Sequence, residues 1–323
     1  MKKLLARIYP PVALVAAETI SPQTLCVAVV QDRTATSWRS LLQALPVLFK
    51  LRIVSLLLFA AVGGAFLAAG GWPGTDRLIL LLVTGGLAAS GASALNQYLE
   101  RDTDALMART RKRPLVTGAI ARPGWVPYVA GVMIVGPSLA VLPANPALAF
   151  FLLLGAAIYV GIYTVWLKPR TLLNIVIGGA AGSAAVLSGS AAVGHWNDPG
   201  AVVLALLIFL WTPSHFWSLA MVYRNDYARG GVPMLPVRTT PRQAAFWVLV
   251  HTGTTALAAL LLAGHAALGW LYFVPVGLAS LDLMVRNVRL LTQPDGKLAL
   301  SLFKASNLFL ALVLLMICID AVL

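Results

Sequence analysis

The sequence predicts an all-α membrane protein with nine transmembrane helices and a cytoplasmic N-terminus. Of its 323 residues, 59% are hydrophobic and only 11% are charged, whereas soluble domains carry about 25% charged residues. Apolar stretches of the roughly 20 residues that cross a bilayer as a helix follow one another along the chain. The basic residues fall between these stretches in a one-sided pattern. Together these observations exclude a water-soluble globule.

The spans are expected where apolar runs are bounded by proline, glycine or charged residues. They are predicted at about 47–69, 77–99, 125–143, 146–167, 171–193, 201–223, 244–263, 265–285 and 301–322. The seventh has a clear start signal in Thr240, Pro241 and Gln243. Thr240 would cap the helix, Pro241 suits its first position, and Gln243 completes a capping box.

The basic residues predict the topology. With nine spans, alternate connections collect 23 of the 24 Lys and Arg residues on one side, and only Arg77 falls on the other. Cationic loops stay in the cytoplasm. We therefore expect a multi-pass protein of the cell membrane whose N-terminus and cationic loops face the cytoplasm and whose C-terminus lies outside.

Residues 1–40 are predicted to be an N-terminal extension, and 41–323 to be one transmembrane domain. The first 30 residues contain an apolar run that is interrupted by three prolines and Glu18. A signal peptide and an interfacial helix are the alternatives. An extension is favoured over a cleaved signal because a translocated N-terminus would conflict with Lys50 and Arg52, which precede the first span.

Charge and cysteine content exclude other classes. The net charge of +13 does not indicate nucleic-acid binding, because the basic residues are not gathered on a solvated domain. The two cysteines, Cys26 and Cys318, are far apart in the sequence. They can build neither a disulfide framework nor a thiolate metal site.

Three of the eleven carboxylates, Glu100, Asp102 and Asp104, lie within five residues at the predicted cytoplasmic end of the second span. On a helix, Asn96, Glu100 and Asp104 drift by about 80° while rising about 12 Å, so they form one stripe of oxygens. Mg²⁺ takes oxygen ligands and is commonly held by one or two carboxylates together with substrate phosphates. The stripe therefore predicts a magnesium site.

Four cations, Arg109, Arg111, Lys112 and Arg113, follow within five positions. Arginine and lysine are the donors that phosphate oxygens prefer, so the stripe and the cations together predict a diphosphate site. The alternative is that the cations only enforce topology and that Glu100 and Asp104 pair with neighbouring arginines.

The spacing of Asn96, Glu100 and Asp104 is similar to the NxxxDxxxD motif of UbiA-type intramembrane prenyltransferases. The wider run 96–114 resembles the protoheme IX farnesyltransferase branch, also called heme O synthases, as do 50–52, 163–171, 174–178, 215–217 and 226–236. The resemblance covers about 45–320. It implies a UbiA-like bundle, Mg²⁺ as cofactor, farnesyl diphosphate and heme B as substrates, heme O as product, and a downstream heme A synthase as a further partner.

The resemblance also implies roles for individual residues, with two departures. Glu100 replaces the usual Asp, which shifts a bound ion by about one methylene. In place of a second DxxxD motif the chain offers only Asp226, either a second metal ligand or a surface partner of Arg224 or Arg229. The predicted catalytic residues are Asn96, Glu100, Asp104, Arg101, Asp102 and Asp226, and the predicted metal ligands are Asn96, Glu100, Asp104 and Asp226.

The predicted substrate-binding residues are Lys50, Arg52, Arg109, Arg113, Lys168, Arg170, Asn174, His215 and Tyr227. The lysines and arginines at helix ends are expected to contact diphosphate or heme propionates, and snorkelling to the interface is the alternative. Pro213 is expected to kink the sixth span. His215 beside it would contact heme or accept a proton, unless it only bonds a neighbouring carbonyl.

The resemblance implies electrophilic transfer of a farnesyl group to a heme vinyl group. A quinone precursor or another aromatic acceptor is the alternative within this class. A secondary transporter is a remote alternative, because such proteins have paired broken helices and a midplane site, whereas only the sixth span is clearly interrupted. Asp282 and Arg286 are predicted to form a structural i,i+4 pair.

Overall fold

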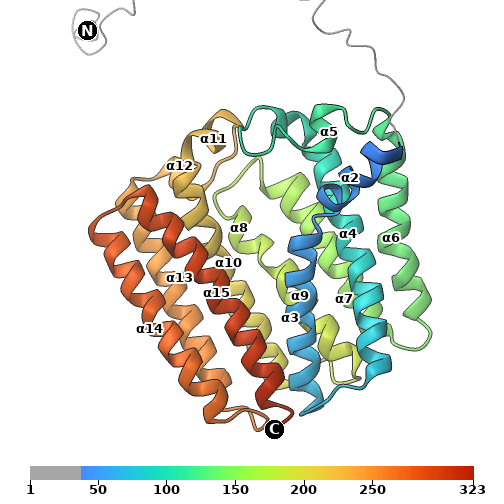
Figure 1. Ribbon diagram of the computed structural model, residues 1–323, viewed down its shortest axis with the longest axis vertical. Helices are drawn as coiled ribbons and strands as arrows, with labels where there is room; N and C mark the ends of the chain where they lie inside the picture. The colour runs from blue at the N-terminus through green and yellow to red at the C-terminus, as the bar shows by residue number, and fades with distance from the viewer. Residues whose placement is uncertain (1–37) are drawn as a thin grey trace, which may run out of the picture. The chain divides into compact units, whose positions relative to one another are not determined.

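The computed structural model describes residues 38–323, and every regular element in this part of the chain is helical (Figure 1). The elements, in chain order, are α2 (Trp38–Leu48), α3 (Leu51–Ala69), α4 (Thr75–Ala105), α5 (Pro114–Thr117), η2 (Pro123–Trp125), α6 (Val126–Val141), α7 (Pro146–Ala156), η3 (Ala157–Leu167), α8 (Asn174–Gly178), α9 (Ala180–Ala192), α10 (Pro199–Val222), α11 (Arg224–Arg229), α12 (Leu235–Arg238), α13 (Pro241–Leu262), α14 (Trp270–Thr292) and α15 (Gly296–Asp320).

Nine stretches among the described residues are long and apolar enough to cross a membrane, which confirms the predicted number of spans. They are Leu51–Ala69, Thr75–Ala105, Pro123–Val141, Pro146–Leu167, Asn174–Ala192, Pro199–Val222, Pro241–Leu262, Trp270–Thr292 and Gly296–Asp320. The chain is thus an all-α, multi-pass membrane protein. The prediction for the N-terminal extension falls almost wholly on residues 1–37, which lie outside the described residues.

Several predicted boundaries differ from the structure, and contacts explain two of them. The first span does not continue back to 47, because Lys50 adopts a left-handed φ of 49° and separates α2 from α3. The eighth begins at Trp270 rather than 265. Its first turn is capped from a distant part of the chain, since the Asp320 carboxylate accepts hydrogen bonds from the backbone N–H groups of Gly269 (2.6 Å) and Tyr272 (3.0 Å).

Other local predictions are confirmed. Thr240 and Gln243 form the expected capping box at the start of α13. Arg286 donates a hydrogen bond to Asp282 one turn away, over 2.7 Å. Helix α10 continues through Pro213, and the kink expected there stays a prediction.

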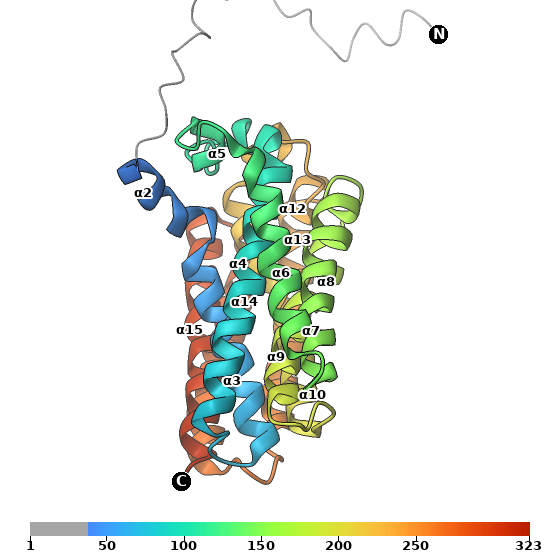
Figure 2. The same cartoon turned by 90° about the vertical axis from the view of Figure 1, so that its right-hand side faces the viewer.

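The helices run side by side in a bundle, in which both consecutive helices and helices distant in sequence pack together (Figures 1 and 2). Helix α10 packs on α13, α14 packs on α15, and α3 packs on α9. The α3–α9 contact requires glycine at two positions. A Cβ on Gly189 would lie 1.7 Å from the carbonyl oxygen of Ala61, and one on Gly64 would lie 2.3 Å from that of Val186.

The fourth span changes from an α-helix to a π-helix halfway along its length. It starts as α7 and continues as a π-helix, η3, through Leu167. The Thr164 hydroxyl donates to the carbonyl of Tyr159, five residues earlier, over 2.7 Å. On an α-helix, residues five apart point about 140° from each other. The wider π turn, with its i→i+5 bonding, instead brings Tyr159 and Thr164 toward one face.

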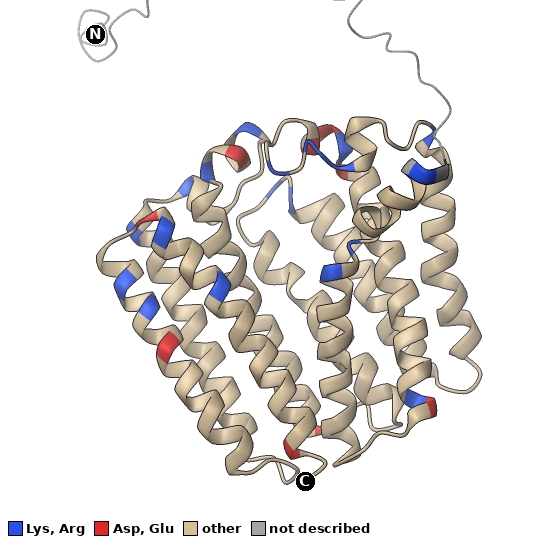
Figure 3. Cartoon of the chain, in the orientation of Figure 1, with Lys and Arg blue, Asp and Glu red and all other residues tan. Residues whose placement is uncertain are grey.

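Charged side chains are distributed unevenly along the bundle. Figure 3 shows Lys and Arg gathered at the end that carries α5, α11 and α12. Arg77, in the first turn of α4, belongs to the opposite end. Helix α4 runs from that sparsely charged end to the cationic end, where its last turns carry the predicted oxygen stripe.

Candidate active site at the cationic end of the bundle

Asn96, Glu100 and Asp104 lie on successive turns of α4, and all three are buried, with 1%, 8% and 1% of their surface exposed. Helix α4 extends to Ala105, six residues beyond the predicted end of the span, so the whole stripe is helical. A buried carboxylate needs a partner charge or hydrogen bonds, because desolvation of an isolated charge is costly. The stripe therefore depends on the segments packed around it.

Three cations from three segments meet this stripe. Lys50, at the break between α2 and α3, donates to Asn96 Oδ1 over 2.6 Å. Lys168, at the end of η3, donates to Glu100 Oε1 over 2.5 Å. Arg113, from the loop after α4, forms an ion pair with Asp104 and lies 3.9 Å from Glu100 Oε2. These six residues, Lys50, Asn96, Glu100, Asp104, Arg113 and Lys168, are called the polar cluster below.

The Lys50 amine is perturbed by this setting. Burial lowers its pKa to about 7, and repulsion from Arg113 and Lys168 contributes to the lowering, while attraction from Glu100 and Asp104 partly offsets the shift. Around neutral pH both protonation states of Lys50 are therefore populated. In both states the amine can donate a hydrogen bond to Asn96.

Residues of the π-helix η3 form hydrogen bonds with two members of the polar cluster. Asn96 Nδ2 donates to Thr164 Oγ1 over 2.9 Å, and Lys50 Nζ donates to the Tyr159 hydroxyl over 2.9 Å. The ring of Tyr163 stacks on that of Tyr159, with centroids 5.9 Å apart. Sequence reasoning did not select Tyr159 or Thr164 as site residues. The available signal was three hydroxyl-bearing residues close together in an otherwise apolar span.

The cluster fits a hard divalent cation. Asp104 Oδ1 is buried and has no hydrogen-bond partner among the described residues. It lies on the same helical stripe as the side-chain oxygens of Asn96 and Glu100, the ligand type that Mg²⁺ takes. No group of three or more His, Cys, Asp or Glu side chains within residues 38–323 is arranged to hold a metal. Two carboxylates and an amide suit an ion whose remaining ligands are water and phosphate oxygens.

A second set of contacts joins α11 to the loop after α4. Asp226 is buried, pairs with Arg229, and accepts a hydrogen bond from the backbone N–H of Arg109 over 3.2 Å. The Arg109 guanidinium donates to the Tyr227 hydroxyl over 3.3 Å. The pairing with Arg229, one of the two alternatives for Asp226, is present. A metal-ligand role for Asp226 stays a prediction, since protein groups contact both of its carboxylate oxygens.

Four of the predicted site residues that lie outside the polar cluster have solvent-exposed side chains. Arg101 and Asp102 pair with each other at 3.6 Å, and their side chains are 42% and 92% exposed. Both point away from the stripe because they occupy other faces of α4. Arg52 is exposed on the first turn of α3. Arg170 is also exposed and donates to backbone carbonyls of its own turn.

Two further predicted residues are buried elsewhere. Asn174 donates to the carbonyl of Thr171 over 2.7 Å, while its Oδ1 is buried without a partner in the described part of the chain. The His215 ring lies between Trp211 and Phe303, with centroid distances of 4.2 and 4.5 Å. Its Nδ1 is 3.3 Å from the Ser306 hydroxyl, so the partner seen is a hydroxyl rather than the neighbouring carbonyl considered from sequence.

Known proteins share both the sequence and the fold of this chain. Residues 56–313 match the model of the UbiA prenyltransferase family. The protoheme IX farnesyltransferase of Metallosphaera sedula is 41% identical over 270 residues, which are 84% of this chain and 93% of that protein. Protoheme IX farnesyltransferase 2 of Paramagnetospirillum magneticum is 39% identical over 283 residues, or 87% of this chain and 98% of that protein. The Thermus thermophilus protoheme IX farnesyltransferase is 38% identical over 91% of this chain, which spans only 48% of its length.

Solved structures share the fold at low sequence identity. A digeranylgeranylglyceryl phosphate synthase aligns with a TM-score of 0.73 and 14% identity, covering 87% of this chain and 98% of that one. A UbiA homologue from Archaeoglobus fulgidus, bound to DMAPP and Mg²⁺, aligns with a TM-score of 0.61 and 16% identity over 85% of this chain and 99% of that one. The match over most of the sequence, the similar relatives and the shared bundle lead to one conclusion. The chain belongs to the UbiA prenyltransferase family.

Proposed function

We propose that this chain transfers the farnesyl group of farnesyl diphosphate to a vinyl side chain of heme B, with addition of water, to give heme O. The relatives that are about 40% identical over most of the chain carry the name protoheme IX farnesyltransferase, which supports this choice of substrates. One structural observation supports the type of reaction, the transfer of a prenyl group from a diphosphate. Asp104 Oδ1 is buried, has no hydrogen-bond partner within residues 38–323, and lies among cations at the end of an apolar bundle.

In this proposal Asn96, Glu100 and Asp104 hold Mg²⁺. The bound ion would neutralise diphosphate charge and so improve the leaving group. The UbiA homologue described with Mg²⁺ and DMAPP supports a metal-dependent reaction. Lys50, Arg113 and Lys168 donate to phosphate oxygens as negative charge grows on them. For this, Arg113 and Lys168 release the carboxylates that they contact in the structure.

The bonds change in a simple order. The C1–O bond of farnesyl diphosphate breaks, and diphosphate leaves with the electron pair. The π electrons of a heme vinyl group form the new carbon–carbon bond to C1, which leaves a cation beside the macrocycle. Water adds there and loses a proton, giving a hydroxyethylfarnesyl side chain. The apolar helices exclude water from the allylic cation until the carbon–carbon bond has formed.

The finer cellular assignments belong to the same proposal. The concentration of Lys and Arg at one end of the bundle supports a cytoplasmic orientation of that end, by the tendency of cationic loops to stay in the cytoplasm. We place the chain in the cell membrane with its N-terminus and active site facing the cytoplasm. A heme A synthase is the partner proposed to receive the product.

Mass spectrometry of extracted heme tests the function directly. Purified protein is incubated with heme B, farnesyl diphosphate and Mg²⁺, and the expected product is heme O, formed only when all three are present. Replacing heme by an aromatic quinone precursor tests the alternative acceptor. Asp104→Asn should abolish conversion even at saturating Mg²⁺. Conversion at the wild-type rate by this variant would refute the metal assignment.

A further inference from the structure

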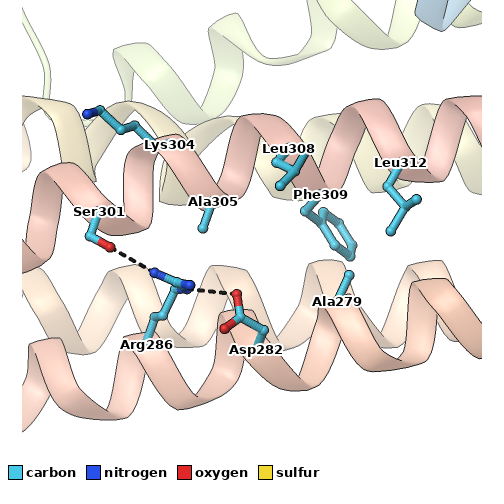
Figure 4. A pocket seen from close by; sticks show the side chains of 9 residues that line it. All are labelled: Ala279, Asp282, Arg286, Ser301, Lys304, Ala305, Leu308, Phe309 and Leu312. Carbon is cyan, nitrogen blue, oxygen red and sulfur yellow. Dashed lines mark hydrogen bonds and ion pairs between the residues drawn. The ribbon is translucent and has the colours of Figure 1, made fainter.

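A groove of about 330 Å³ lies between α14 and α15, away from the polar cluster (Figure 4). One end is polar. There Arg286 donates hydrogen bonds to Asp282 Oδ2 (2.7 Å) and Ser301 Oγ (2.8 Å). Lys304 also lines this end, and its amine is directed away from Arg286 (Figure 4). The other end is apolar and is lined by Leu308, Phe309, Leu312 and Ala279. The groove thus has the polarity of an amphipathic ligand.

The polar end of the groove lies toward the cationic end of the bundle. Ser301 and Lys304 precede Leu308 and Leu312 on α15, which begins at the cationic end. From Ser301 to Leu312 the helix rises about 16 Å. A ligand in the groove would therefore place its polar group toward the cationic end and its hydrocarbon toward the middle of the bundle. This is the orientation of a phospholipid in the adjacent leaflet.

Lys304 lies deeper in its span than a lysine at the membrane surface would. Lys304 is eight residues from the start of α15, or about 12 Å along its axis, and it lies within the candidate span. Its side chain is exposed and has no ion pair or hydrogen bond within residues 38–323. Ionisable side chains inside a span are costly and normally face a partner or a polar cavity. Leu308, one turn further in, is 72% exposed, so this face is open to the bilayer.

The net charge of the groove favours a phosphodiester over a prenyl diphosphate as its ligand. Arg286 and Lys304 contribute two positive charges and Asp282 one negative charge, which leaves one positive charge. A single phosphodiester carries one negative charge and would be neutralised. A prenyl diphosphate carries up to three, so most of its charge would stay uncompensated at this depth.

We propose that this groove binds an anionic phospholipid, with its phosphodiester at Lys304 and Arg286 and an acyl chain along Leu308, Phe309 and Leu312. The site is separate from the polar cluster and does not depend on the proposed function. Basic pockets between transmembrane helices are known to hold anionic lipid head groups.

Native mass spectrometry of the full chain, titrated with phosphatidylglycerol or phosphatidylcholine, tests the proposal. The wild type should bind phosphatidylglycerol more tightly. Lys304→Gln should weaken that binding about fivefold, the effect of one cation near an anionic head group. Lys297→Gln removes one charge from the same helix outside the groove and should leave the affinity unchanged. Ala305→Trp keeps every charge but fills the groove, and should also weaken binding.

Three results would overturn the proposal. The first is equal affinity for the two lipids. The second is the same affinity for Lys304→Gln as for Lys297→Gln. The third is displacement of bound phosphatidylglycerol by equimolar farnesyl diphosphate, which would assign the groove to the prenyl substrate. Melting curves of all variants establish that each is folded before its affinity is interpreted.

Discussion

Asn96 donates a hydrogen bond from its side-chain nitrogen to the Thr164 hydroxyl over 2.9 Å. The Thr164 proton is already directed to the carbonyl of Tyr159, over 2.7 Å. The hydroxyl can therefore only accept from Asn96, which sets the amide nitrogen toward the π-helix. The amide oxygen must then face Lys50 and the polar cluster, where a metal ligand would be needed.

Thr164→Val should raise the Mg²⁺ concentration for half-maximal activity about tenfold, the usual effect of removing a group that orients a metal ligand. Valine keeps the shape but cannot accept the amide hydrogen bond. Thr164→Ser retains the hydroxyl and should restore the wild-type Mg²⁺ dependence. Thr254→Val, at an exposed threonine on α13, is the matched control. Equal Mg²⁺ dependence of the Thr164→Val variant and the wild-type enzyme would contradict this role.

Arg113→Gln should lower kcat/KM for farnesyl diphosphate by about ten- to a hundredfold, the range for losing a charged hydrogen bond. Arg113 is the cation that reaches both Asp104 and Glu100. Steady-state kinetics with varied farnesyl diphosphate measure the effect. Arg111→Gln removes an exposed charge two residues away and should stay within about twofold of wild type, as is usual for an exposed charge. Similar losses in both variants would mean that the loop acts only through its overall charge.

Gly189→Ala should lower the apparent Tm by several degrees, because the added Cβ would overlap the backbone of α3 at Ala61. Overpacking of this kind costs about 1–3 kcal/mol. Thermal unfolding in detergent measures the effect. Gly277→Ala, in α14, is the control, because a Cβ there would meet no atom of another helix within 4 Å in the described part of the chain. A wild-type Tm for Gly189→Ala would show that α3 and α9 separate without cost.

Asp320→Ala should destabilise the C-terminal helices by about 1 kcal/mol, the usual cost of removing a helix cap. The variant loses the acceptor for the N–H groups of Gly269 and Tyr272. Hydrogen exchange of the first turn of α14 should increase locally. Asp76→Ala changes an exposed carboxylate in the first turn of α4 and should leave exchange in α14 unaltered.

The sequence predicted those features that depend on short-range pattern. Hydrophobic runs located the nine spans, and an i,i+4 spacing placed Asn96, Glu100 and Asp104 on one buried face. The capping box at Thr240 follows from four adjacent residues. In each case the helical period or a cap motif contains the information.

Features that depend on contacts between distant residues were missed, because no short-range pattern in the sequence encodes them. The start of α14 depends on Asp320, some fifty residues later. The π-helical register that turns Tyr159 and Thr164 toward α4 leaves no periodic signature in an apolar span. Lys50 was selected as a helix-end cation, but its left-handed backbone and its contact with Asn96 require the assembled bundle.

The net charge of the polar cluster complements that of a magnesium-bound prenyl diphosphate. With Lys50 protonated, its three bases exceed its two acids by one. In the proposed function, a prenyl diphosphate that arrives with one magnesium ion would bring a single excess negative charge, so the occupied cluster would become electroneutral. Binding of the substrate would then cancel the excess positive charge that the buried polar cluster carries when it is empty.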